Sequence, residues 1–544
     1  MATVTTTMPT HRSGGMTSEE KLVIFASSLG TVFEWYDFYI YGTLGVFLAK
    51  YFFSNVPANV GFIFALLAFA AGFAVRPFGA LIFGRLGDLI GRKYTFLVTM
   101  SLMGVGTFFI GVLPGYATWG IAAPIVLIAL RLVQGLALGG EYGGAAIYVA
   151  EHAPMGKRGY YTSWIQTTAT LGLFMALLLI LGVRTLMGEG DFGDWGWRIP
   201  FLLSAVLLAV SIWIRLKLNE SPLFQRMKEA GKTSKRPLTE AFGQWSNAKI
   251  AILALLGATA GEAVIWYGGQ FYALFFLTQT LKVPGVTAQI LIAVALAIGT
   301  PFFIVFGALS DKIGRKPIML AGFALGALTY FPIFQGLTHF ANPRLEQALA
   351  TAPVTVTADP AECSFQFKAT GTEKFTTGCD NIKSALVNLS VNYTNVAAPA
   401  GTKASVKIGN DAIPADAPNL ATRIANAVKA HGYPGTADPN EINYPMTILL
   451  LTILVVYVTL VYGPIAAWLV ELFPTRIRYS GLSLPYHIGN GWFGGFLPAT
   501  VFAIVAATGN IYSGLWYPIG VATMSFVVAL FFLPETKDRR IDEI

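Results

Sequence analysis

Long apolar segments alternate with short polar segments along almost the whole chain of 544 residues. An α-helix needs about 20 apolar residues to cross the hydrocarbon core of a bilayer. The pattern predicts an all-α membrane protein with twelve such helices, at residues 22–47, 58–83, 94–113, 120–149, 163–187, 199–216, 250–280, 286–309, 317–337, 446–470, 480–506 and 513–533.

The amino-acid composition supports a membrane protein. Hydrophobic residues make up 54% of the chain and charged residues only 12%, whereas soluble domains carry about 25% charged residues. Residues 1–20 are polar and rich in Thr, and they lack the apolar core of a signal peptide. We therefore expect a disordered tail at 1–20, followed by a first membrane helix that is not cleaved off.

The Lys and Arg residues are distributed unevenly between the two sides of the predicted helices. If both termini lie in the cytoplasm, the short cytoplasmic segments hold 23 of the 37 Lys and Arg residues. The short segments on the other side hold only four, Lys50, Arg184, Arg198 and Lys282. This bias predicts that both termini are cytoplasmic. The net charge of +8 therefore reports topology, and it does not indicate binding to nucleic acid.

The two halves of the chain resemble each other. Three pairs of similar segments recur with offsets of 223, 320 and 315 residues, namely GRLGDLIGRK (84–93) with GALSDKIGRK (307–316), YGGAAIYVAEHAPMGKR (142–158) with YGPIAAWLVELFPTRIR (462–478), and LNES (218–221) with LPET (533–536). Such self-similarity indicates a duplicated structural unit. Here the unit is a group of six helices.

An insertion interrupts the second half. Because the offset grows from 223 to 320 residues, the second half holds about 97 extra residues between its first two repeated segments. We place them at 340–445, between the ninth and tenth helices. The ninth helix starts from a cytoplasmic loop, so this segment is expected on the periplasmic or extracellular side. It holds eight Lys and Arg residues, but long translocated segments are exempt from the charge rule.

The insertion has the pattern of a small α+β module. Alternating apolar residues predict strands in PVTVTAD (353–359), CSFQFKA (363–369) and LVNLSVNY (386–393). Apolar residues at helical spacing predict a helix over 419–431. The only two cysteines of the chain, Cys363 and Cys379, lie in this segment. An oxidising location predicts a disulfide between them; the alternative is two reduced thiols in a flexible loop.

The repeated signatures resemble the major facilitator superfamily. The segments EWYDFYIYG, RPFGALIFGRLGDLIGRK and RLVQGLALGGEYGGA resemble more narrowly the metabolite:H⁺ symporters, the bacterial permeases for oxoglutarate, citrate, shikimate and proline or betaine. The resemblance implies two six-helix bundles around a central cavity and a location in the bacterial inner membrane. It implies transport of a small metabolite together with a proton by alternating access.

Together the repeat and the resemblance predict a division of the chain into seven parts. These are a cytoplasmic tail (1–20), an N-terminal six-helix bundle (21–217), a cytoplasmic loop (218–249), helices seven to nine of a C-terminal bundle (250–339), the extracytoplasmic module (340–445), helices ten to twelve (446–534) and a cytoplasmic tail (535–544).

Charged residues inside the predicted spans are the candidates for proton coupling, because a charge in a membrane helix is costly and usually functional. Glu34 and Asp37 are three residues apart and share one face of the first helix. Arg131 and Glu141 lie in the fourth helix. A carboxyl that alternates between an Arg partner and a proton suits a proton-coupled carrier. The alternatives are a permanently ionised pair that holds two helices together, or side chains that face water.

The candidates for substrate binding are Arg76 and Arg198, because the planar guanidinium binds both oxygens of a carboxylate. Arg198 is alternatively an interfacial anchor between its Trp neighbours. The seventh helix adds polar and aromatic candidates, for which packing is the alternative role: Glu262, Trp266, Tyr267 and Gln270.

Both loop signatures carry an acid and a base that predict a conformational latch, Asp88 with Arg92 and Asp311 with Arg315. Each Asp can pair with these cations or with a helix N-terminus of the opposite bundle. The alternative is topological anchoring alone. Leu89 departs from the basic residue that stands at Lys312 in the second copy, which argues against two equal latches. Glycines four residues apart, Gly135, Gly139 and Gly143, predict close packing with a neighbouring helix.

Several function classes find no support in the sequence. The five His residues do not cluster, no metal-binding spacing is present, and no GxxxxGKS or GxxxxGKT loop for ATP occurs. We expect no enzyme activity, no cofactor and no metal. The expected function is proton-coupled symport of a small organic anion, with a bilayer, protons and an organic acid as partners. The alternatives are a carrier of zwitterions such as proline or betaine, and a transporter-like sensor that uses the outer module.

Overall fold

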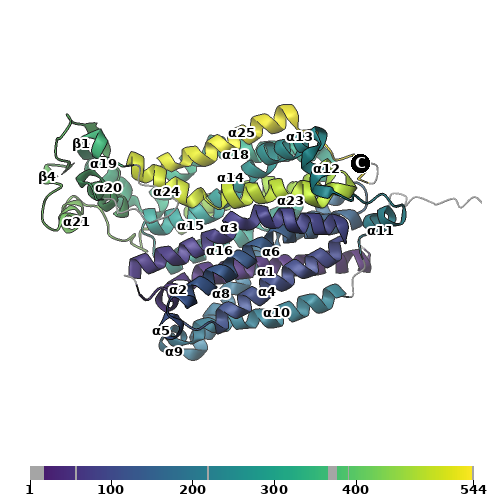
Figure 1. The fold of residues 1–544 in the computed structure, drawn as a ribbon. Coiled ribbons are helices and arrows are strands. Elements are labelled where there is room, and N and C mark those ends of the chain that lie inside the picture. The colour runs from purple at the N-terminus through teal and green to yellow at the C-terminus, as the bar shows by residue number, and fades with distance from the viewer. Residues whose placement is uncertain (1–16, 56–57, 217–219, 365–375, 390, 542–544) are drawn as a thin grey trace, which may run out of the picture.

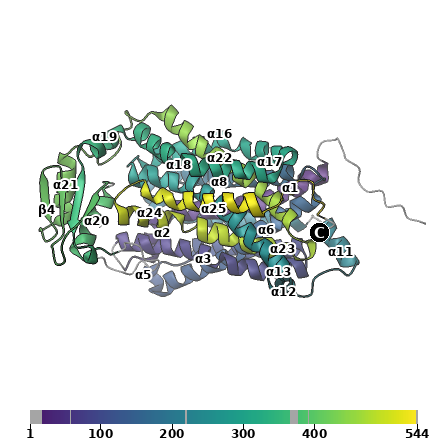
Figure 2. The same cartoon turned by 90° about the horizontal axis from the view of Figure 1, so that it is seen from above.

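The computed structural model describes residues 17–55, 58–216, 220–364, 376–389 and 391–541. A long bundle of helices carries a small module at one end, and the chain ends at the other (Figures 1 and 2). We call these the insertion end and the signature end. Most of the predicted tail at 1–20 and most of the strand predicted at 363–369 lie outside the described residues.

The N-terminal bundle and the connection that follows it consist of helices only. Their bounds are α1 (Ser18–Thr43), α2 (Gly45–Phe52), α3 (Ala58–Leu89), α4 (Arg92–Val112), α5 (Tyr116–Trp119), α6 (Ala122–His152), α7 (Arg158–Gln166), α8 (Thr168–Met187), α9 (Glu189–Asp194), η1 (Gly196–Arg198), α10 (Ile199–Leu216), α11 (Pro222–Glu229) and α12 (Pro237–Gly243).

The C-terminal bundle is also helical, but four of its segments are π-helical turns: η2, η3, η4 and η7. Its bounds are α13 (Trp245–Ala254), η2 (Leu255–Thr259), α14 (Ala260–Tyr267), η3 (Gly268–Tyr272), α15 (Ala273–Phe275), η4 (Phe276–Thr280), α16 (Gly285–Gly299), α17 (Pro301–Ile313), α18 (Arg315–Ala341), α22 (Tyr444–Leu472), η6 (Thr475–Ile477), α23 (Arg478–Ile488), η7 (Gly489–Gly494), α24 (Leu497–Thr508), η8 (Ser513–Leu515) and α25 (Trp516–Phe532).

The predicted membrane helices are present. Within the described ranges, ten helical segments are long and apolar enough to cross a bilayer. They coincide with ten of the predicted spans. The other two predicted spans, 22–47 and 58–83, correspond to α1 and α3, which run alongside the ten (Figure 1). The fold class is therefore confirmed as two six-helix bundles with an inserted module.

Glycines bring the backbones of α3 and α6 into direct contact. A Cβ on Gly135 would collide with the carbonyl oxygen of Gly72, and a Cβ on Gly139 would collide with that of Arg76. A ridge of small residues permits this approach between membrane helices. The close packing predicted from the glycine spacing is therefore confirmed, and it fixes the backbone of Arg76 against α6.

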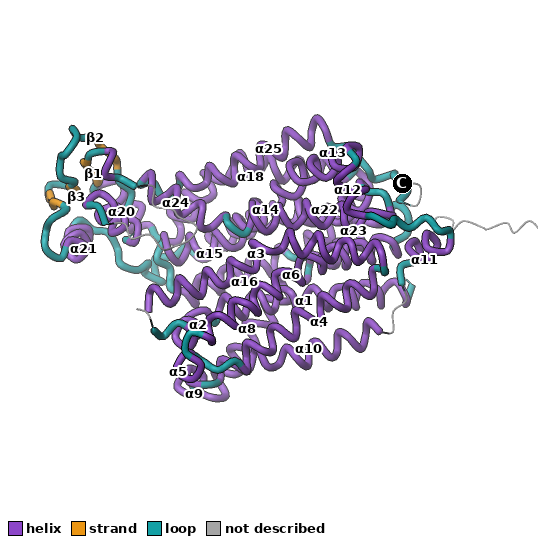
Figure 3. The backbone as a smooth tube through the Cα atoms, in the orientation of Figure 1, coloured by secondary structure: helices purple, strands orange, loops and turns teal. Residues whose placement is uncertain are grey.

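The inserted module combines helices with a small sheet (Figure 3). The strand order is β2-β1-β3-β4; β1 pairs parallel with β2, whereas the β1–β3 and β3–β4 pairs are antiparallel. The module's elements are α19 (Pro343–Thr351), β1 (Val354–Ala358), η5 (Pro360–Glu362), α20 (Gly378–Asn388), β2 (Thr394–Ala397), β3 (Ser405–Ile408), β4 (Asp411–Pro414) and α21 (Leu420–Ala430).

Two of the module's predicted elements are confirmed and one is wrong. The strand predicted at 353–359 is β1, and the helix predicted at 419–431 is α21. The strand predicted at 386–393 instead begins as the end of α20. The side chain of Thr377 caps that helix by accepting a hydrogen bond from the Asp380 N–H at 3.1 Å. The apolar residues that follow are buried at helical spacing, so the alternation seen from residue 386 onward misled the prediction.

The predicted disulfide is present between Cys363 and Cys379, whose Cα atoms are 5.3 Å apart. Cys379 is buried in the first turn of α20, so the bridge ties that helix to the segment after β1. By the loop-entropy model, a bridge over this distance in sequence stabilises a domain by roughly 3 kcal/mol, a large contribution for a module of this size.

The module is bound to the C-terminal bundle through loops of that bundle. The Ala437 N–H donates to the Lys282 carbonyl oxygen at 3.0 Å, in the loop before α16. The Tyr393 N–H donates to the Gly509 carbonyl oxygen at 2.9 Å. The Ile511 N–H donates to the Asn392 side chain at 2.7 Å, in the loop after α24. Together with the chain connections to α18 and α22, these bonds fix the module to one bundle.

The glycine contact between α3 and α6 predicts a stability difference between two alanine variants. Gly139→Ala places a methyl group against the backbone of α3, and overpacking of this kind costs about 1–3 kcal/mol. At Gly182 in α8 an added Cβ meets nothing within 4 Å. Thermal melting in detergent should show a clearly lower Tm for Gly139→Ala and an almost unchanged Tm for Gly182→Ala. Equal Tm values for the two variants would contradict the backbone contact.

Candidate functional site

A buried network of four polar side chains lies inside the N-terminal bundle. Arg131 Nη1 lies 3.1 Å from Asp37 Oδ2, which forms an ion pair between α6 and α1. Thr107 Oγ1 donates to Asp37 Oδ1 at 2.6 Å, and Gln134 Nε2 donates to the same oxygen at 3.2 Å. Gln134 Oε1 accepts from Arg131 at 2.7 Å. The carboxylate of Asp37 therefore has three donors, from Arg131, Thr107 and Gln134.

The same network borders a small pocket between α1, α3 and α6. The pocket is lined by Glu34, Asp37, Arg76 and Arg131, together with Phe38, Phe73, Leu138 and two glycines. The guanidinium of Arg76 lies over the ring of Phe73, 4.5 Å from its centroid. The structure thus brings together four residues that the sequence singled out from three different helices. Gln134 and Thr107 were missed, because uncharged polar residues are common in membrane helices.

Glu141 lies further along α6 than Arg131 and Gln134, and it is fully buried. Neither of its carboxylate oxygens has a hydrogen-bond partner among the described residues. The positive charge of Arg215, in α10, interacts electrostatically with the carboxyl group of Glu141. Arg215 donates to the Ala26 carbonyl oxygen at 2.9 Å and lies over the ring of Phe96. Arg215 is one of the 23 Lys and Arg residues counted in the short cytoplasmic segments, but its side chain is buried in the bundle.

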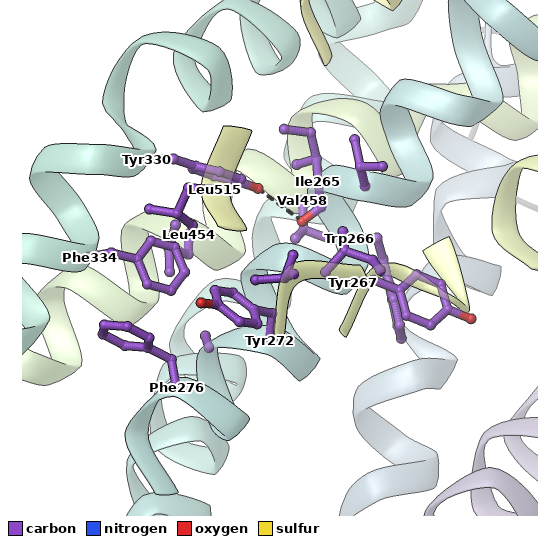
Figure 4. Packing of buried hydrophobic residues seen from close by; sticks show 14 of the residues in the cluster. Ile265, Trp266, Tyr267, Tyr272, Phe276, Tyr330, Phe334, Leu454, Val458 and Leu515 are labelled. Carbon is purple, nitrogen blue, oxygen red and sulfur yellow. Dashed lines mark hydrogen bonds between the residues drawn. The ribbon is translucent and has the colours of Figure 1, made fainter. Parts of the chain in front are cut away.

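An aromatic layer joins the two bundles beside the pocket. Trp266 of α14 stacks on Trp35 of α1 with 4.7 Å between ring centroids, and Phe271 packs edge-on against Phe38 at 4.7 Å. Tyr267 packs edge-on against Phe73 of α3 at 6.1 Å. Figure 4 shows Tyr267 pointing away from the cluster around Tyr330 and Phe334 inside the C-terminal bundle. Trp266 and Tyr267 therefore line the boundary between the bundles.

Several buried polar groups of the C-terminal bundle lie near this layer. Glu262 is fully buried, and Asn490 Nδ2 donates to its Oε2 at 2.9 Å. The other oxygen of Glu262 has no hydrogen-bond partner among the described residues, and neither do the side-chain amide of Gln270 and the two ring nitrogens of His487. Asn490 and His487 were missed, because they lie in a Gly-rich stretch without a charge or motif that marks them.

Arg198 lies apart from this site. It ends η1, and its Nη1 donates to the carbonyl oxygens of Gly111 at 3.0 Å and Leu113 at 2.8 Å. Its guanidinium also lies over the ring of Trp197, 4.5 Å from the centroid. These bonds satisfy one carbonyl in the last turn of α4 and the carbonyl of the residue that follows the helix, where partners within the helix are lacking. The geometry therefore favours the anchoring alternative for Arg198.

Two aspartates join the bundles at the signature end. Asp88, at the end of α3, accepts from the Tyr479 N–H at 3.2 Å and the Ser480 N–H at 2.8 Å, in the first turn of α23. Asp311, at the end of α17, accepts from the Gly159 N–H at 2.8 Å and from the Tyr160 N–H at 2.8 Å, in the first turn of α7. Each aspartate thus binds a helix N-terminus of the opposite bundle.

Arginines and glutamates complete this end with the same arrangement in both halves. Around the first signature, Arg92 lies 3.3 Å from Asp88 and 3.9 Å from Glu151, and Arg478 of the second half lies 2.8 Å from Glu151. Around the second signature, Arg315 lies 2.7 Å from Asp311 and 3.0 Å from Glu471, and Arg158 of the first half lies 3.3 Å from Glu471. The two signatures therefore form similar contacts despite Leu89.

The weaker sequence repeats contain a signal for these contacts, because they place Glu residues at matching positions in the two halves. Glu151 and Glu471 stand at the same place in the second repeated pair. The third pair supplies two further caps. Glu220 accepts from the backbone N–H of Arg92 at 3.1 Å, and Glu535 accepts from that of Arg315 at 3.0 Å. All three repeated pairs therefore meet at the signature end.

The chemistry of the site is that of ion pairs and hydrogen bonds. In the part of the chain that the structure describes, no group of three or more His, Cys, Asp or Glu side chains could hold a metal ion.

Comparisons with known proteins agree on a family. The model of the family described as "Sugar (and other) transporter" matches residues 22–356 and 424–544. The alpha-ketoglutarate permease of Escherichia coli strain K12 is 35% identical over 345 residues, which cover 63% of this chain and 78% of the permease. The shikimate transporter of the same strain is 34% identical over 326 residues, 59% of this chain and 73% of that protein.

A further relative aligns along almost the whole chain. A putative metabolite transport protein of Haemophilus influenzae is 32% identical over 527 residues, 95% of both chains. That alignment runs through the inserted module, most of which the family model skips. Among solved structures, the proton:xylose symporter XylE with a bound bromodeoxyglucose has a TM-score of 0.65 at 15% identity and covers 97% of this chain and 98% of its own. This last likeness shows the fold.

These relatives are transporters, and transporters of this kind are not enzymes. The fold matches that of XylE, and because the family model matches most of the chain, the chain belongs to the sugar (and other) transporter family.

Proposed function

We propose that this transporter carries a small organic anion together with a proton by alternating access. The observation that carries the proposal is the buried Asp37–Arg131 pair, 3.1 Å apart, beside a pocket that Glu34 and Arg76 also line. A buried carboxylate with a single Arg partner binds a proton when that partner moves away, and releases it when the partner returns. The pair therefore has the chemistry of a proton-coupling switch.

Arg76 is the proposed anchor for the substrate. Its guanidinium is buried in the pocket, and its Nε has no hydrogen-bond partner among the described residues. A guanidinium in a site without bulk water binds a carboxylate through two parallel hydrogen bonds. The curated relatives include transporters named for alpha-ketoglutarate and shikimate, which are carboxylates. Glu34 stands beside Arg76 as a second group able to exchange a proton.

The proposed latch is the pair of aspartates at the signature end. Asp88 and Asp311 hold the N-termini of α23 and α7, so the two bundles are joined there in this structure. Opening that end requires both contacts to break. We place this end in the cytoplasm and residues 340–445 outside a bacterial inner membrane, because the Lys and Arg residues of the short segments gather at the signature end.

The coupling role of Asp37 predicts a specific loss of active accumulation. In proteoliposomes with an imposed pH gradient, Asp37→Asn should accumulate labelled alpha-ketoglutarate or shikimate at least tenfold less than the unmodified protein, because the amide cannot bind a proton. Exchange of labelled for unlabelled substrate, which needs no net proton movement, should persist. The matched control is Asp194→Asn, whose side chain is 80% exposed. Gradient-driven accumulation by Asp37→Asn at the unmodified rate would contradict the role.

The latch predicts a change in access to the signature end. The two native cysteines are joined, so Ser483→Cys in α23 provides a single reactive thiol that is buried between the bundles. Adding Asp88→Asn removes a charge worth up to about 2 kcal/mol at a helix N-terminus. Alkylation of this thiol by N-ethylmaleimide should become about 5- to 30-fold faster. Adding the exposed Asp416→Asn should change nothing. An unchanged rate with Asp88→Asn would refute the latch.

The proposed orientation predicts where the disulfide can be reached. In spheroplasts of cells that express the protein, a membrane-impermeant phosphine followed by an impermeant maleimide–polyethylene glycol should modify Cys363 and Cys379. A chain with Cys363→Ser, Cys379→Ser and Lys232→Cys carries its thiol on the loop after α11 and should react only after permeabilisation. The reverse labelling pattern would place the module in the cytoplasm.

A further inference from the structure

The C-terminal bundle places an incompletely paired carboxylate at the boundary with the N-terminal bundle. Glu262 is fully buried, and Asn490 donates to one of its oxygens at 2.9 Å. Its Oε1 has no hydrogen-bond partner among the described residues. A buried polar atom without a partner costs about 1–3 kcal/mol, and native proteins seldom leave one without a reason. Glu262 Oε1 is therefore an acceptor that is available to a donor from outside the chain.

One short turn connects Glu262 with Arg76. Asn490, which bonds Glu262, lies in the π-helical turn η7, Gly489–Gly494. The next residue, Gly491, faces α3 so closely that an added Cβ would lie 2.9 Å from the Phe73 carbonyl oxygen and 3.7 Å from the Arg76 Cβ. Successive residues of η7 thus contact Glu262 on the C-terminal bundle and the backbone around Arg76 on the N-terminal bundle. Inserted π turns of this kind are frequent at functional sites.

Two further buried polar groups of the segment that carries Glu262 suit a small polar ligand. The indole Nε1 of Trp266 and the amide of Gln270 are buried without hydrogen-bond partners among the described residues. Trp266 also stacks on Trp35, and Tyr267 packs against Phe73. Aromatic walls with a few convergent polar groups are typical of small-molecule sites. The unpartnered atoms include both donors and acceptors, which a purely anionic ligand would not satisfy.

We infer that the substrate has two poles: a carboxylate that binds Arg76, and a hydroxyl or ammonium group that donates to Glu262 Oε1. This inference rests on the proposed function and narrows its substrate class to monocarboxylates that carry a donor group. Asn490 is a positioning residue, because it holds the second oxygen of Glu262 and so orients Oε1. A second carboxylate has no donor of its own for Glu262 Oε1, so a simple dicarboxylate fits this pair of poles poorly.

The test compares pairs of acids that differ in the donor group. Suitable pairs are lactate with propionate, shikimate with its deoxygenated cyclohexene carboxylate, and L-proline with cyclopentanecarboxylate. Binding to the purified full-length protein is measured by calorimetry or thermal shift. At least one donor-bearing acid should bind tenfold or more tightly than its partner, because a site built for a hydrogen bond rejects the analogue that lacks it. The hydroxy acids and the amino acid are measured separately. A preference within the hydroxy-acid pairs indicates a hydroxyl donor, and a preference within the proline pair indicates an ammonium donor.

Three variants test the two poles and the positioning residue. Glu262→Gln should reduce the preference within the responsive pair to less than about threefold and leave the affinity for the donor-free acid within about threefold. Arg76→Gln should weaken both members of the pair by a similar factor. Asn490→Ala should reduce the preference in the same direction as Glu262→Gln. Glu346→Gln, an exposed change in α19 paired with His339, is the control and should leave all affinities unchanged.

The outcomes separate this inference from the proposed function. If the protein binds and accumulates both members of every pair equally, or if Glu262→Gln retains the full preference, the two-pole inference is wrong while the carboxylate transporter stands. In that case Glu262 Oε1 is satisfied by water. If the unmodified protein binds and accumulates alpha-ketoglutarate but no acid of the panel, only the inference is overturned. If it binds and accumulates neither alpha-ketoglutarate nor any acid of the panel, the proposed function is overturned as well.

Discussion

The cost of an uncompensated charge inside a membrane bundle governs the arrangement of this protein. Each ionised group buried among apolar helices requires an opposite charge, several donors or a helix terminus. Asp37 has Arg131, Thr107 and Gln134 as partners, and Asp88 has the first turn of α23. Because each of these partners lies on another helix, satisfying a charge also determines which helices lie side by side.

The same constraint distinguishes the acidic groups at the signature end from those at the centre of the bundles. At the signature end, the acidic side chains have several partners. Glu471, for example, forms ion pairs with both Arg158 and Arg315, and it accepts a hydrogen bond from Thr536 at 2.7 Å. At the centre, Glu141 and Glu262 keep oxygens without partners among the described residues. Saturated groups stabilise one arrangement of the bundles. Unsaturated groups lower the stability of the empty state and leave binding energy for a ligand or a proton.

Local patterns in the sequence predicted much of the fold and part of the site. Apolar length predicted the helices, the shift between repeats located the module, and charges in apolar segments identified Glu34, Asp37, Arg76 and Arg131. Residues whose role depends on side-chain direction escaped prediction. Arg215 stands at a helix end, and only its contacts with Ala26 and Phe96 show that it turns inward. Uncharged partners such as Asn490 carry no signal until the fold places them beside an acid.

The attachment of the module has a mechanical consequence. Backbone hydrogen bonds fix it to loops before α16 and after α24, and its own ends continue into α18 and α22. Among the described residues, these anchors all belong to one bundle. A module fixed in this way moves together with that bundle when the bundle rotates. Displacement grows with distance from the axis of rotation, so a small tilt of the helices produces a larger excursion at the far edge of the sheet. The module would therefore report the orientation of the C-terminal bundle at a point far from its helices.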